Sequence, residues 1–418
     1  MYKILQDKFV KDNVVFFVGS MIIAVFNYLY HPIMSHMMSV EEFGEVQTLI
    51  SLMYITGILM LVVGAVIVNI VANNMYLHTK EYKNIINQLY KLSLYVVGIF
   101  IIGMIGVSSY LAHFLQFDSI VSFLPLWLII IVGVPSTFFS SYLRGVQRFG
   151  VVSIMGIISS AGKLVFAMIF VYVGLNVFGA ITAFVIASLV ALLYAIQKTK
   201  GKFKLSLQEK VVFSSAIKKE LQYGFLIFIS LGYITFLYTS DVLFVKHFFE
   251  PEIAGLYSGI ATVGRIIFFV TASAIGVLVP SIKLEVAKKQ NHAVFKKTFA
   301  IVLLLGTSIF ILFILASNQV ITILIGNSYL TLTSLLPLVA FYIFLVSIVN
   351  IFYAYFIALR DHRMIISSSI GFIIIIGLQV FNHNSLDAVV WNYIIGLCTT
   401  LIFVVYFFYK DTIRYLIP

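Results

Sequence analysis

Long apolar runs alternate with short polar segments along the whole 418-residue chain. Each run is long enough to cross the roughly 30 Å hydrocarbon core of a bilayer as a helix. A membrane β-barrel would instead show alternating segments of about ten residues, and the chain has none. The pattern predicts an all-α, polytopic fold with twelve membrane-spanning helices at 14–37, 47–73, 93–113, 120–142, 151–173, 175–197, 220–248, 254–279, 298–316, 333–358, 364–382 and 388–409.

Composition supports a lipid environment. Hydrophobic residues make up 61% of the chain and charged residues 10%, whereas soluble domains carry about 25% charged residues. The first apolar run is too long for a signal peptide and lacks a small-residue cleavage site, so we expect it to be retained. Cys398 is the single cysteine, which excludes an internal disulfide, and no Cys/His cluster has metal-ligand spacing.

The charges predict the topology. Of the 27 Lys and Arg, all but Lys163, Lys246 and Arg265 lie in the two tails or in the connections after even-numbered helices. By the positive-inside rule, both termini are then cytoplasmic, in an inner or plasma membrane. The net charge of +11 therefore reflects topology, not nucleic-acid binding. The opposite connections contain His36, Glu41, Glu42, Asp118, Glu250, Glu252 and Asp387.

An internal repeat divides the helices into two sets of six. Residues 35–44 align without gaps with residues 246–255, and three identical residues (His, Glu and Gly) recur 211 positions apart. The dipeptides Leu143-Arg144 and Leu359-Arg360 also follow the fourth helix of each half. Parallel repeats of this kind place a substrate site near the midplane, between the lobes. We predict an N-lobe at 1–200, a basic cytoplasmic linker at 201–219 and a C-lobe at 220–418.

Charged residues inside predicted spans are the strongest candidates for a site, since each costs roughly 2.5–3.5 kcal/mol at a helix centre. Lys163 lies midway along helix 5, Arg265 along helix 8, and Asp241 in the outer half of helix 7. Arg265 and Lys163 can bind an anionic headgroup, since Arg suits phosphate through its bidentate fork. Alternatively, Asp241 and Arg265 pair only to tether two helices, and Lys163 snorkels or caps a neighbouring helix.

Polar residues on helices 1 and 7 are candidate sugar contacts. Asn27, Tyr30 and Tyr238 supply amide and phenol groups, although Tyr is also the common residue of the interfacial belt. We assign no catalytic residue and no metal ligand. The segment 156–164 fails as a phosphate-binding Walker loop, because its glycine spacing is wrong and Leu164 stands where Ser or Thr would bind magnesium.

Two segments carry a family resemblance. Met38-Ser-Val-Glu-Glu-Phe-Gly-Glu45 and the run from Asp241 to Tyr257, followed by Gly264-Arg-Ile and Val279-Pro280, resemble Wzx-type oligosaccharide flippases. These polysaccharide biosynthesis proteins belong to the multidrug/oligosaccharidyl-lipid/polysaccharide exporter superfamily. The resemblance covers the whole chain in length, helix number and two-lobe repeat. It implies a MATE-like fold.

The resemblance also implies a function. We expect a flippase, not an enzyme, that moves an undecaprenyl-diphosphate-linked repeat unit of O-antigen lipopolysaccharide, capsule or a related polysaccharide to the outer leaflet by alternating access. The cationic lumen of the family carries over to Arg265 and Lys163. We expect no cofactor, coupling to an H⁺ or Na⁺ gradient, a monomer in contact with membrane lipid, and a polymerase and other assembly proteins as partners.

Three other functions stay open. A multidrug/cation antiporter of the same fold would need an acidic, aromatic cavity, whereas this chain has more intramembrane base than acid. A membrane polymerase or ligase would need a sizeable outer loop, and a scaffold would leave the mid-span charges unexplained. Lipid II flippases usually have two further helices, for which the chain has no room.

Overall fold

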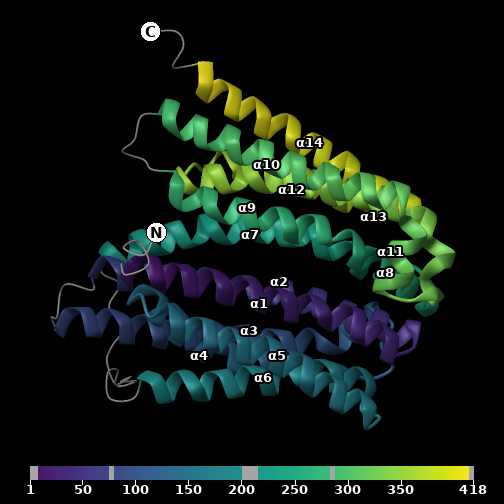
Figure 1. Cartoon of the computed structure of the whole chain (residues 1–418), viewed down its shortest axis with the longest axis horizontal. Coiled ribbons are helices and arrows are strands. Elements are labelled where there is room, and N and C mark those ends of the chain that lie inside the picture. The colour runs from purple at the N-terminus through teal and green to yellow at the C-terminus, as the bar shows by residue number, and fades with distance from the viewer. Residues whose placement is uncertain (1–7, 75–79, 200–214, 283–287, 414–418) are drawn as a thin grey trace. The chain divides into compact units, whose positions relative to one another are not determined.

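The computed structural model describes residues 8–74, 80–199, 215–282 and 288–413, and these ranges contain helices and no strand (Figure 1). The helices are α1 (Lys8–Met37), α2 (Val40–Asn74), α3 (Lys80–Phe114), η1 (Ile120–Phe123), α4 (Leu124–Gly145), α5 (Phe149–Tyr172), α6 (Asn176–Thr199), α7 (Ser215–Phe248), α8 (Pro251–Gly264), α9 (Ile266–Ser281), α10 (Lys288–Leu315), α11 (Ser317–Leu324), η2 (Asn327–Leu335), α12 (Leu336–Ala358), α13 (Arg363–Phe381) and α14 (Leu386–Ile413). Within these ranges, twelve segments are long and apolar enough to cross a membrane, which confirms the predicted number.

One span differs from its predicted form. Instead of one helix over 254–279, α8 and α9 meet at a break at Arg265. Ser258 Oγ donates to Ala254 O and Thr262 Oγ1 to Ser258 O, both at 2.7 Å. Such bonds to the preceding turn tend to bend helices. Gly264 stands at the break because α12 packs close there: a Cβ would lie 2.7 Å from Val339 Cγ1.

The chain forms two compact units, Met1–Gly224 and Phe225–Pro418. Of the predicted linker, residues 201–214 lie outside the described residues, and residues 215–219 form the first turns of α7.

In the first unit, α5 packs against α1 and α6, and α4 packs against α2 and α6. Small residues bring α1 and α5 close together: a Cβ added at Gly19 would lie 2.5 Å from Ser153 Cβ. Close backbone approach of this kind favours helix association in lipid, where van der Waals contact replaces the hydrophobic driving force. The tight α1–α5 contact positions Lys163, which lies further along α5.

In the second unit, α12 packs against α9, α10 and α14, and α13 packs against α14. Buried hydroxyl pairs join these helices. Tyr233 and Thr400 approach to 2.6 Å, and Thr271 donates to Ser347 at 2.9 Å. Hydrogen bonds between membrane helices each contribute about 0.6–2 kcal/mol. The second unit is therefore held partly by polar contacts.

The junctions between helices repeat between the units. α1 ends at Met37 and α2 begins at Val40, while α7 ends at Phe248 and α8 begins at Pro251. Both boundaries are 211 residues apart, the offset that the sequence motif predicts.

The repeat of Leu-Arg dipeptides is not a structural equivalence. Leu143 and Arg144 lie inside α4, whereas Leu359 and Arg360 follow the end of α12. The equivalent positions are instead Gln147 and Arg360. Both have positive φ, at 58° and 54°, and each is followed by a residue whose N–H bonds five residues back, Arg148 to Leu143 O at 2.8 Å and Asp361 to Phe356 O at 2.9 Å. This is the Schellman ending of a helix.

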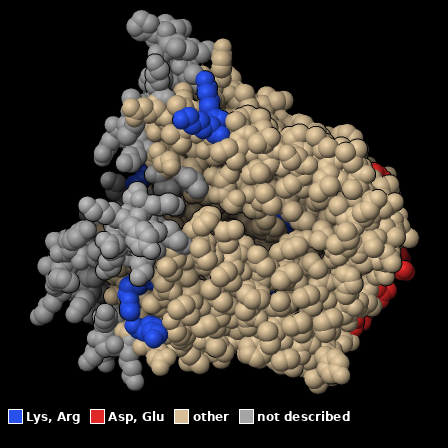
Figure 2. Space-filling view, in the orientation of Figure 1, with Lys and Arg blue, Asp and Glu red and all other residues tan. Residues whose placement is uncertain are grey.

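Most charged side chains that are visible lie at the helix ends of each unit, and most of the visible surface between those ends is uncharged (Figure 2). In the first unit, Arg144 and Arg148 lie at one end of α4 and α5, and Glu41 and Glu42 begin α2 at the other. In the second unit, the basic end holds Arg360, Arg363 and Lys410, and the acidic end holds Glu250, Glu252 and Asp387.

Candidate functional site

Lys163 projects from the middle of α5 and is 8% exposed. Its ammonium donates to Asn27 Oδ1 on α1 at 2.7 Å. It also lies 5.0 Å from the ring centre of Tyr30 and 4.8 Å from that of Phe184 on α6, both within cation–π range. We call Asn27, Tyr30, Lys163 and Phe184 the Lys163 site.

These contacts are all with uncharged groups. Lys163 neither reaches a helix end nor pairs with any Asp or Glu in the part of the chain that the structure describes. Asn27 is exposed, so the amine lies one hydrogen bond beneath the surface of its unit. A buried cation without an opposite charge is costly, and an anion at this position would offset that cost.

Tyr30 is fully buried, and its ring packs against Lys163. Its hydroxyl donates to Ala180 O on α6 at 3.1 Å, and its ring meets Phe184 edge-to-face at 5.1 Å. The phenol predicted as a sugar contact is therefore occupied by a backbone carbonyl.

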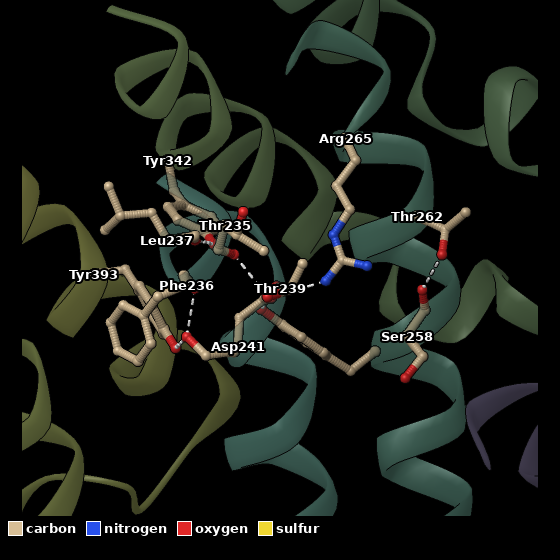
Figure 3. A network of polar contacts seen from close by, with 12 residues as sticks. Thr235, Phe236, Leu237, Thr239, Asp241, Ser258, Thr262, Arg265, Tyr342 and Tyr393 are labelled. Carbon is tan, nitrogen blue, oxygen red and sulfur yellow. Dashed lines mark hydrogen bonds and ion pairs between the residues drawn. The ribbon is translucent and has the colours of Figure 1, made fainter. Parts of the chain in front are cut away.

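Asp241 and Arg265 form an ion pair in the second unit (Figure 3). Arg265 Nη2 donates to Asp241 Oδ1 at 2.8 Å, and Tyr257 on α8 donates its hydroxyl to Asp241 Oδ2 at 3.0 Å. Asp241 is 0% and Arg265 4% exposed. The charge of Arg265 is thus matched within its own unit, unlike that of Lys163. We call Asp241, Tyr257 and Arg265 the Arg265 site.

Further polar contacts join α7 to neighbouring helices near this pair (Figure 3). Tyr342 donates to Leu237 O, and Ser240 and Tyr393 share a hydrogen bond of 2.6 Å. These bonds fix α7 against α12 and α14, and so hold the carboxylate of Asp241 in place. Tyr238, the remaining predicted sugar contact, is partly buried and stacks on Phe268 with ring centres 4.4 Å apart.

The predicted residues thus fall into two groups, one in each unit. Lys163, Asn27 and Tyr30 come together in the first unit, and Asp241 and Arg265 come together in the second. Sequence reasoning missed Phe184 and Tyr257. No sequence signal marks Phe184 in an apolar helix, whereas Tyr257 lies on α8 within the family-like segment that starts at Asp241. In the described ranges, no three His, Cys, Asp or Glu residues approach closely enough to hold a metal ion.

Residues 9–285 match the family described as polysaccharide biosynthesis protein. The chain belongs to this family. Among curated proteins, nothing matches it.

Solved structures share the fold at low sequence identity. An inward-facing multidrug resistance MATE family transporter of the MOP superfamily is 14% identical, with a TM-score of 0.76 over 97% of this chain and 99% of that one. An outward-facing structure of such a transporter gives 15% identity and a TM-score of 0.68 over 97% and 95%. The lipid II flippase MurJ, in an inward closed conformation, gives 12% and 0.72 over 95% and 87%. This polysaccharide biosynthesis protein is therefore a multi-pass membrane protein with a MATE-like fold, as predicted.

Proposed function

We propose that this protein is a flippase for an undecaprenyl-diphosphate-linked oligosaccharide, a repeat unit of O-antigen, capsule or a related polysaccharide. It moves the lipid from the cytoplasmic to the outer leaflet by alternating access. Membership of the polysaccharide biosynthesis family supports the substrate class, and the MATE-like fold is one that transporters and a lipid flippase use.

The observation that carries the proposal is the unmatched charge of Lys163. A buried ammonium with only neutral contacts attracts an anion, and a lipid diphosphate is an anion that polysaccharide assembly uses. The same observation disfavours the multidrug/cation antiporter, because a cationic drug would be repelled. Lys163 and Asn27 contact the headgroup in this proposal. Tyr238 offers an aromatic ring to sugars, and Arg265 is a candidate cation for the headgroup in the second unit, as argued below.

The charge distribution supports cytoplasmic termini in an inner or plasma membrane. We further propose that an H⁺ or Na⁺ gradient drives the cycle without a bound cofactor. The protein acts as a monomer that hands its product to a polymerase and other assembly proteins.

Reconstitution tests the proposal. Purified protein in liposomes receives a fluorescent lipid-diphosphate oligosaccharide in one leaflet, and an impermeant quencher reports its appearance in the other. We expect faster exchange than in protein-free liposomes. Lys163→Ala should slow it by at least about tenfold, the effect of losing one charge-assisted contact of about 1.4 kcal/mol.

Lys198→Ala is the matched control, because Lys198 is an exposed lysine at the end of α6 in the same unit. It should keep the wild-type rate. No acceleration by the wild-type protein, with any repeat unit of its host, would overturn the proposal.

A further inference from the structure

Asp241 occupies only part of the hydrogen-bonding capacity of Arg265. The guanidinium makes one contact to Asp241, through Nη2, while the second carboxylate oxygen accepts from Tyr257 instead. Arg265 Nε is buried and has no partner among the described residues. A guanidinium paired in full would bind a carboxylate through two parallel N–H groups. Of the two parallel N–H groups that could bind one carboxylate, Arg265 therefore uses only the one on Nη2.

A buried donor without a partner is costly, and its presence at an ion pair calls for an explanation. The pair itself lies at the break between α8 and α9. A phosphate offers more acceptor oxygens than Asp241 leaves for Arg265, and it can engage Nε and Nη2 together. Asp241 is thus a weaker partner for Arg265 than a diphosphate.

We propose that Asp241 is an exchangeable counter-ion that occupies Arg265 when no substrate is bound and is displaced by the anionic headgroup. Tyr257 is a positioning residue that holds the carboxylate in the occluding position. Displacement of Asp241 removes the ion pair that joins α7 to the junction of α8 and α9. Substrate binding therefore loosens the packing of the second unit at this point. Return of Asp241 to Arg265 then helps to expel the headgroup.

This inference rests on the proposed function but makes a separate prediction. If Asp241 competes with the headgroup for Arg265, removing its charge should raise the affinity for an anion. Removing a residue that only stabilises the fold should not raise that affinity. Replacing Asp241 by Asn keeps its shape and an acceptor for Tyr257 while removing the charge. Binding should tighten and release should slow.

Titration calorimetry with inorganic pyrophosphate tests the inference on the purified full-length protein. Asp241→Asn should raise the affinity by about tenfold, and adding Arg265→Gln should remove that gain. Asp387→Asn is the control: it removes the same charge from an exposed position in the first turn of α14. It should leave the affinity at the wild-type value.

Tyr257→Phe gives a second arm should Asp241→Asn fail to fold. It keeps both charges and removes only the hydroxyl that holds Asp241 Oδ2, so a smaller gain in affinity is expected. The inference would be overturned if folded Asp241→Asn and Tyr257→Phe bound pyrophosphate no more tightly than Asp387→Asn. It would also be overturned if none of the folded variants bound pyrophosphate. A wild-type protein that flips lipid while these affinities stay equal would refute the counter-ion alone. Absence of flipping with a gain in affinity would refute the flippase alone.

Discussion

Lys163 and Arg265 are both buried cations at mid-span, but their surroundings differ in kind. Asn27 and two aromatic rings surround Lys163, whereas Asp241 neutralises Arg265. The repeat offset of 211 places Tyr30 at the position of Asp241. In each unit, therefore, a buried cation contacts the same position of the first helix. That position is the ring of Tyr30 in the first unit and the carboxylate of Asp241 in the second. From this asymmetry we expect Lys163 to attract an anion more strongly than Arg265 does in the unliganded protein.

The buried pair gives a stability prediction. Arg265→Ala leaves Asp241 charged and buried, which should cost about 3–5 kcal/mol of unfolding free energy. The double variant Arg265→Ala, Asp241→Asn should recover much of this loss, since it removes both charges. Denaturation in detergent, followed by tryptophan fluorescence, measures both values. Equal loss in the single and double variants would show that packing of the Arg265 side chain matters instead of its charge.

Before the structure, Lys163, Arg265 and Asp241 could be identified because charge is rare in apolar spans. Their partners could not. Hydrophobic periodicity does not reveal which face of α6 packs against α5, so the contact between Phe184 and Lys163 could not be predicted. The sequence also does not indicate that the hydroxyl of Tyr30 donates to Ala180 O.

At the scale of the element, the contact between α1 and α5 sets the depth of the Lys163 site. Gly19→Leu should separate these helices, because even a Cβ would meet Ser153. The expected cost is about 1–3 kcal/mol, typical of overpacking. Gly103→Leu in α3 is the matched control, since a Cβ there meets nothing within 4 Å. Thermal unfolding of the two variants, compared with wild type, checks this. Equal unfolding temperatures would contradict the close α1–α5 packing.

The start of α13 gives a prediction about pH. Partial burial acts to raise the pKa of Asp361, but the hydrogen bonds and charge of Arg363 outweigh it and hold the pKa below its ordinary value. The carboxylate accepts from the Arg363 backbone N–H at 2.9 Å and from its Nε at 3.0 Å. A lowered folded-state pKa means that this stabilisation is complete above pH about 4 and is lost as the pH falls further.

Asp361→Asn should therefore lower the free energy of unfolding by up to about 1 kcal/mol at pH 7, because it removes the negative charge that pairs with Arg363. The difference from wild type should shrink below pH 4. Unfolding measured from pH 3 to pH 7 tests this, with the exposed Asp118→Asn as control. A difference that grows on acidification would contradict the assignment.

The break at Arg265 shows where periodicity fails. Residues 254–279 are mostly apolar around one charge, so the sequence predicts one helix. Ser258 and Thr262 bonding to the preceding turns, and the approach of Val339 to Gly264, are tertiary and local details that an apolar pattern does not encode.

At the scale of the whole molecule, helix number was predictable because membrane thickness constrains the length of each span, and the repeat was predictable because the motif at 35–44 recurs at 246–255. The charge bias of the connections predicts the orientation. In a Cys398→Ser background, Glu41→Cys should react with an impermeant thiol reagent in intact cells, and Lys198→Cys only after permeabilisation. Both positions are exposed at helix ends. The reverse labelling pattern would show that the protein has the opposite orientation in the membrane, and it would contradict the proposed direction of transport.

In the proposed mechanism, Lys163 recognises the charge of the headgroup. The most direct measurement compares flipping rates of a lipid-linked oligosaccharide with a diphosphate and of the same glycolipid with an uncharged linker, in wild type, Lys163→Arg and Lys163→Met. Wild type should prefer the diphosphate by at least about tenfold, Lys163→Arg should keep much of this preference, and Lys163→Met should lose it. An unchanged preference in Lys163→Met would contradict the account.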